Sequence, residues 1–119
     1  MVDITALLKA DLDDDHRNTC ETIIGGQKIV MYSTDLTGAD IEWVTKRHPK
    51  FIDSPSLEAT VDLIIRKAQD EEGTRIFDAS HKPMLLRMKV SWLSDVRARL
   101  FKDDGLDFQD EALETASKN

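Results

Sequence analysis

Two short β-branched segments flank a pair of glycines, and this pattern constrains the fold more than any other feature of the sequence. The segments are residues 22–24 and 29–32, with Gly25 and Gly26 between them. Such runs on either side of a glycine turn predict an antiparallel hairpin. Because a lone hairpin is marginal in water, other elements must cover its apolar face. We therefore predict a helix-dominated α+β domain with a short antiparallel β-hairpin packed on three or four helices.

The first predicted helix begins directly after the hairpin. Thr37 is a suitable N-cap, Asp40 lies three residues later, and Leu36 and Ile41 occupy the positions of a hydrophobic staple. The helix should end near Arg47, because the residue before a proline is disfavoured in helical geometry and His48 precedes Pro49.

A second helix is predicted to start at Ser54 and Pro55 and to close near residues 70–73, with Gly73 as its C-terminal cap. Asp62 and Arg66, four residues apart, suggest an ion pair on its solvated face. Its apolar stripe consists of Leu57, Val61, Ile64, Ile65 and Ala68.

The third predicted helix is long, from about residue 83 to 102, and Asp78 or Ser80 should cap its start. Its apolar residues spread over more than half of the circumference, which exceeds the needs of one core face. Basic residues are also concentrated here: Arg87, Lys89, Arg97, Arg99 and Lys102.

Length and composition indicate one domain. A chain of 119 residues with 40% hydrophobic residues can bury one modest core. We divide it into an N-terminal arm (1–18), a hairpin-plus-helix domain (19–102) and a polar, acidic C-terminal tail (103–119). The arm is expected to be a loosely attached helix followed by an acidic loop.

The overall charge argues against several classes of partner. The 16 Lys and Arg residues and 23 Asp and Glu residues give a formal charge of -7, which repels nucleic acids and anionic lipid surfaces. There is one cysteine, no basic leader, and no apolar run near the roughly 20 residues that span a bilayer. We expect a cytoplasmic protein that binds neither nucleic acid nor membrane.

No constellation of residues predicts an active site. His16, His48 and His81 lack the spacing of paired metal ligands, and Cys20 lies beside Glu21 on a strand, which should raise its pKa. We expect Cys20 to be a small, half-buried strand residue. Gly25 and Gly26 belong to no phosphate-binding loop, and the acidic run 13–15 lacks a calcium-loop pattern. We predict a protein that is not an enzyme and has no cofactor or metal.

The order of elements resembles that of the tail assembly chaperones of long-tailed bacteriophages and prophages. The resemblance covers about residues 19–101 and rests on the hairpin, the helix entry at 35–40, the helix 60–70, the connection 72–78 and the long helix to Phe101. The basic residue that often precedes the leucine at the helix entry is missing here, where Asp35 precedes Leu36.

This resemblance implies a non-enzymatic protein of the host cytoplasm that is not retained in the mature virion. It would bind the tape-measure protein, help recruit tail tube subunits and be able to self-associate. The chain would correspond to the short form, without a frameshifted extension. A helical client needs an exposed apolar stripe with a polar rim, and we assign this protein-binding surface to Leu85, Met88, Trp92, Val96 and Arg99.

Two alternatives remain open. The chain could be a different small phage structural or head-tail connector protein, which would stay in the virion. It could also be an acidic inhibitor that occupies a nucleic-acid-binding partner by charge mimicry, since the charge of -7 on a small domain resembles a phosphate array.

Overall fold

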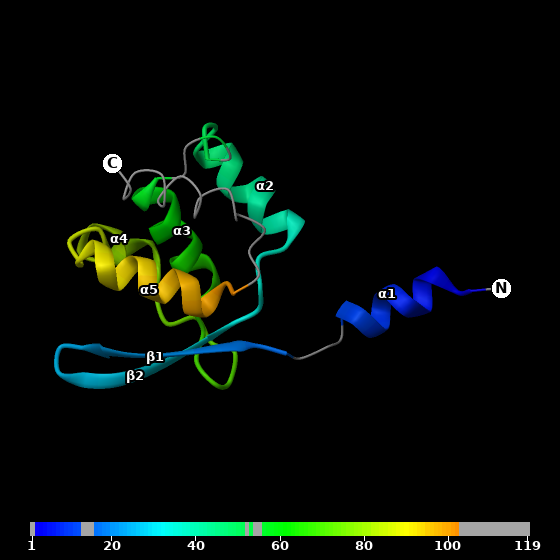
Figure 1. Cartoon of the computed structure of the whole chain (residues 1–119), viewed down its shortest axis with the longest axis horizontal. Helices are drawn as coiled ribbons and strands as arrows, with labels where there is room; N and C mark the ends of the chain where they lie inside the picture. The colour runs from blue at the N-terminus through cyan, green and yellow to red at the C-terminus, as the bar shows by residue number, and fades with distance from the viewer. Residues whose placement is uncertain (1, 13–15, 52, 54–55, 103–119) are drawn as a thin grey trace, which may run out of the picture.

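The computed structural model describes residues 2–12, 16–51, 53 and 56–102 (Figure 1). These residues form one small α+β domain with a two-stranded antiparallel sheet, as predicted. The elements in chain order are α1 (Ile4–Leu12), β1 (Asn18–Ile24), β2 (Gln27–Ser33), α2 (Gly38–Arg47), α3 (Leu57–Lys67), the 3₁₀ turn η1 (Ala79–His81), α4 (Lys82–Leu85) and α5 (Val90–Leu100).

The hairpin forms where the sequence predicts it. Ile24 pairs with Gln27, so Gly25 and Gly26 form a two-residue turn. Both glycines have positive φ angles, 58° and 81°, which β-carbon-bearing residues rarely adopt. The glycine pair therefore fixes the register of all seven paired positions.

Helices cover one face of this hairpin. The Cys20 and Met31 side chains point into the core and are fully buried, and α5 lies along the sheet and packs against both strands (Figure 1). Asn18 ties the two layers together, because its amide Nδ2 donates to the Leu100 carbonyl at 2.8 Å and to Asp35 Oδ1 at 2.6 Å. The buried apolar side chains are Cys20, Met31, Val44, Phe51, Ala59, Val61, Leu63, Ile64, Ala68, Leu85, Leu93, Val96, Leu100 and Phe101.

Helix α2 begins at the predicted N-cap, Thr37, and Asp40 completes a capping box with it. The Thr37 Oγ1 accepts from the Asp40 backbone N–H at 3.2 Å, and Asp40 Oδ2 accepts from the Thr37 N–H at 2.9 Å. Leu36 and Ile41 both pack against the core, as a hydrophobic staple requires. The helix ends at Arg47 with His48 as its C-cap, so the predicted end is confirmed.

Helix α3 differs from the prediction at its C-terminal end. It ends at Lys67 rather than near residues 70–73, because the chain leaves the helix to pair with the hairpin: the Gln69 and Tyr32 backbones exchange hydrogen bonds of 2.8 and 2.9 Å. Gly73, with φ of 87°, lies in the following turn. Ser56 caps the start of the helix, while Ser54 and Pro55 lie outside the described residues.

The predicted long helix over 83–102 is wrong, because the chain is broken between α4 and α5. At about 100° per residue, a continuous helix would place Lys89 about 40° from both Leu85 and Leu93, in the middle of the buried face. In the structure Lys89 is instead an extended N-cap with an exposed side chain. Asp78 caps η1, which precedes α4.

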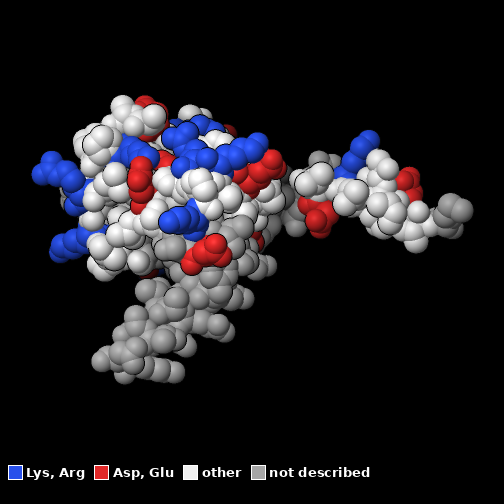
Figure 2. All heavy atoms as spheres, turned by 90° about the horizontal axis from the view of Figure 1, so that it is seen from above, with Lys and Arg blue, Asp and Glu red and all other residues white. Residues whose placement is uncertain are grey.

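The N-terminal segment forms α1, which has no buried residue and extends away from the body of the domain (Figures 1 and 2). Residues 13–15 and the predicted tail, 103–119, lie outside the described residues. Among the helices of the described chain, none has the length and apolar character needed to cross a bilayer.

Candidate functional site

The apolar stripe predicted on the last helix is not a continuous exposed surface. Leu85 and Val96 belong to the core, with 5% and 0% of their surface exposed. Their predicted exposure is wrong, because this part of the chain must cover both α3 and the hairpin, and so it buries more than one face. We do not assign these two residues to a binding surface.

The other three predicted residues attach α5 to its surroundings. Met88 and Trp92 are half-buried against the core, and Trp92 Nε1 donates to Thr22 Oγ1 at 2.7 Å. Arg99 is exposed, pairs with Asp95 at 3.1 Å and donates to the Glu21 carbonyl at 3.4 Å. The exposed apolar side chains near this region are Met84, Leu86 and Val90.

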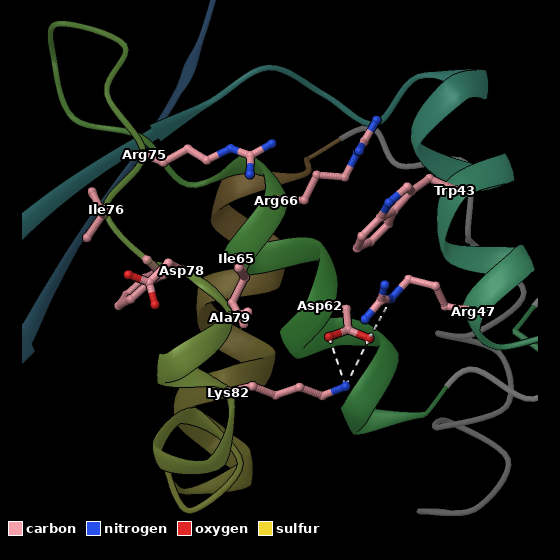
Figure 3. Close-up of a pocket in the computed structure, with 11 residues that line it drawn as sticks. Trp43, Arg47, Asp62, Ile65, Arg66, Arg75, Ile76, Asp78, Ala79 and Lys82 are labelled. Carbon is pink, nitrogen blue, oxygen red and sulfur yellow. Dashed lines mark hydrogen bonds and ion pairs between the residues drawn. The ribbon is translucent and has the colours of Figure 1, made fainter.

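A groove lies instead across α3, between α2 and the connection that leads to α4 (Figure 3). Its volume is about 440 Å³. Trp43 and Arg47, one turn apart on α2, extend into it from one side, and Ile65 and Arg66 of α3 lie along its base. The lining residues are Trp43, Arg47, Asp62, Ile65, Arg66, Arg75, Ile76, Phe77, Asp78, Ala79 and Lys82.

Arginines surround the indole ring on the α2 side of the groove. The guanidinium carbon of Arg47 lies 5.0 Å from the Trp43 ring centroid, and that of Arg66 lies 4.8 Å from it. Arg75 points across α3 from the opposite wall (Figure 3) and forms no ion pair with any other described residue. An apolar surface therefore lies directly beside cations that can receive a carboxylate.

The buried carboxylate of Asp62 holds the basic groups at the lower end of the groove. Its oxygens lie 2.7 Å from His48 Nε2, 3.0 Å from Lys82 Nζ and 3.6 Å from Arg47 Nε. Burial alone would raise the pKa of Asp62, but hydrogen bonds from His48 and Lys82 and the charges of Lys82 and Arg47 outweigh burial and lower it. The predicted solvated pair with Arg66 is wrong, since Asp62 is only 4% exposed and has these other partners.

Arg66 pairs instead with Asp40 of the α2 capping box. Its Nε lies 2.9 Å from Asp40 Oδ1, and Lys67 Nζ lies 2.9 Å from Oδ2. Burial would raise the pKa of Asp40, but the Thr37 backbone N–H and the two cations lower it to about 2. The Asp40 carboxylate, which completes the α2 capping box, thus also fixes Arg66 beside Trp43.

The ionisable groups of the groove suit charge pairing better than proton transfer. Hydrogen bonding to Glu58 raises the pKa of Lys82, and Asp62 has a lowered pKa, so both stay charged near pH 7. Burial raises the pKa of the Cys20 thiol, which is fully buried rather than half-buried as expected. No group of three or more His, Cys, Asp or Glu side chains among the described residues could hold a metal ion.

Comparison with protein-family models, with curated proteins and with solved structures found no match to this chain.

The groove is lined by residues of three segments that are separated in the sequence, so no local sequence motif predicts it. One local signal is the spacing of Trp43 and Arg47, which stand four residues apart on α2. Figure 2 shows Lys and Arg side chains spread over the compact body in the view from above, with acidic residues between them.

Proposed function

We propose that this protein is a non-enzymatic assembly chaperone that binds a helical segment of a client protein in the groove across α3. The observation that carries the proposal is the composition of the groove: half-buried apolar side chains of Trp43, Ile65 and Phe77 lie beside the cations Arg47 and Arg75. A helix that presents apolar side chains and an acidic residue on one face would match both parts.

Contacts within the chain hold the arginines of the groove in position. Arg47 and Arg66 stack on Trp43 and are held by the buried carboxylates Asp62 and Asp40. Side chains that are fixed in advance lose less conformational entropy when a partner binds. The arginines nevertheless keep exposed surface, at 52% for Arg47 and 28% for Arg66, so a carboxylate can reach them.

We assign the client by the resemblance to phage tail assembly chaperones. In this proposal the client is a helix of the tape-measure protein, and the bound chaperone also helps recruit tail tube subunits. The protein works in the host cytoplasm and is absent from the finished particle. Asp35 stands before Leu36 where the family often has a basic residue, so the proposal assigns no role to that position.

Co-purification with the tape-measure protein tests this proposal. A tagged wild-type chain should retain the client, and Arg75→Glu combined with Ala79→Glu should retain at least about tenfold less, because both changes place negative charge in the groove. Arg87→Glu is the matched control: Arg87 is exposed, lies outside the groove and should leave binding unchanged. Equal retention by all three chains would contradict the proposal.

Two further measurements separate the alternatives. Detection of the chain in purified particles by mass spectrometry would favour a structural or connector protein over a chaperone. Binding of a charge-mimicking inhibitor should collapse as salt rises, because its contacts are solvent-exposed charges. Client binding in the groove should weaken only in part, since Trp43, Ile65 and Phe77 contribute apolar contacts that salt does not screen.

A further inference from the structure

Helix α1 presents an apolar face that the rest of the described chain does not cover. Ile4, Leu7, Leu8 and Leu12 are between 57% and 79% exposed, and no residue of α1 is buried. Asp3 caps the helix by accepting from the Ala6 N–H at 3.2 Å, so the helix has its own local start signal. Exposed apolar side chains grouped in this way mark an interaction site.

The apolar face of α1 also carries one acidic residue. At about 100° per residue, Asp11 falls about 20° from Ile4 and about 40° from Leu7, inside the arc that the leucines define. A partner that covers this face must therefore supply both an apolar surface and a cation, because a carboxylate buried without a cation is costly.

The groove across α3 supplies both the apolar surface and the cation. Its lining includes Ile65 and Phe77, and the Arg75 guanidinium forms no ion pair with the other described residues. The acidic residues 13–15 directly follow α1 in the sequence. We propose that α1 of one copy of this chain docks into the groove of a second copy, with Asp11 placed against Arg75.

The position of α1 favours docking into the groove of a second copy over docking into the groove of its own chain. Arg17 donates to the carbonyls of Asp70 and Glu71 at 3.3 and 3.0 Å, which fixes the point where the N-terminal segment leaves the body. From there α1 extends away from the body (Figures 1 and 2). Each copy then presents one helix and one groove, and repeated head-to-tail contacts of this kind build open chains, or rings where the rotation between copies closes.

Sedimentation velocity of the purified protein tests this inference. The wild-type chain should form species that grow beyond a dimer as its concentration rises. Asp11→Lys and Arg75→Glu should each weaken association at least about tenfold, and the double variant Asp11→Lys with Arg75→Glu should recover it, because the pair is reversed. Arg87→Glu, outside the groove, should associate like the wild type. Circular dichroism checks that every variant keeps its helical content.

A mixing experiment identifies the two surfaces independently. Leu7→Asp with Leu8→Asp removes the helix contact, and Arg75→Glu with Ala79→Glu removes the groove contact. Each double variant should be monomeric alone, and the two together should form a heterodimer that grows no further, because only one contact remains intact. A monomeric wild type, an association that Arg75→Glu leaves unchanged, or a mixture without heterodimer would each overturn the inference.

This inference rests on the groove being a protein-binding site, as in the proposed function, but its failure is distinguishable from the failure of that proposal. If the client is retained through the groove while the wild-type chain stays monomeric, the self-association is wrong and the chaperone function stands. If the chain associates as described and the client is not retained, the proposed function is wrong.

Discussion

Asp40→Asn should destabilise the protein because Asp40 joins the α2 cap to the cations at the groove. The carboxylate accepts the Thr37 N–H and pairs with Arg66 and Lys67, and it is only 4% exposed. Asparagine keeps the size of the side chain and one acceptor oxygen but removes the negative charge. Arg66 and Lys67, themselves partly buried, would then lack a counter-ion.

The size of the effect follows from the pKa of Asp40. Its ordinary value of 3.8 is lowered to about 2 in the folded protein, which corresponds to about 2 kcal/mol of stability at neutral pH. Because the folded-state pKa is the lower one, this contribution is complete above about pH 5 and declines as pH falls through 3.8 toward 2. About half of it, roughly 1 kcal/mol, should remain at pH 3.

Urea unfolding followed by circular dichroism measures this dependence. Asp40→Asn should lower the free energy of unfolding by about 2 kcal/mol at pH 7 and by about 1 kcal/mol at pH 3. Glu42→Gln, which removes an exposed carboxylate from the same helix, is the matched control and should change little. A difference between wild type and Asp40→Asn that is the same at both pH values would refute the electrostatic role of Asp40.

Four further substitutions test other parts of the fold by the same unfolding assay. Leu93→Ala, at a core position that is 1% exposed, should cost about 3 kcal/mol; a loss under about 1 kcal/mol would mean that the site collapses or is not core. Gly26→Ala should cost about 1–2 kcal/mol through its positive φ alone, whereas Gly38→Ala, which has equally open surroundings, should be neutral or slightly stabilising. Trp92→Phe should cost about 1 kcal/mol by removing the hydrogen bond to Thr22, and no loss would show that this bond contributes nothing net.

Features determined by neighbouring residues could be predicted from the sequence. The turn at Gly25 and Gly26 and the capping box of Thr37 and Asp40 depend on backbone conformation and hydrogen bonds within a few residues. The hairpin, the start of α2 and the α+β class follow from them. These signals are local, so no knowledge of the tertiary packing was needed.

Features determined by distant contacts could not be predicted. Asp62 and Arg66 have the spacing of a surface ion pair, but the actual partners of Asp62 are His48 and Lys82, 14 and 20 residues away. An apolar arc on a helix likewise does not reveal whether a second layer covers it. Trp92 was therefore assigned to a binding surface, although the hairpin occupies that position.

Site-specific photo-crosslinking tests the central claim, that a helical client binds in the groove, most directly. A photoreactive amino acid at position 79 would stand in the groove, and one at position 98 would stand on α5, outside it; both positions are exposed. With the tape-measure protein present, we predict a crosslink from position 79 and none from position 98. Equal crosslinking at the two positions, or crosslinking from position 98 alone, would contradict the claim.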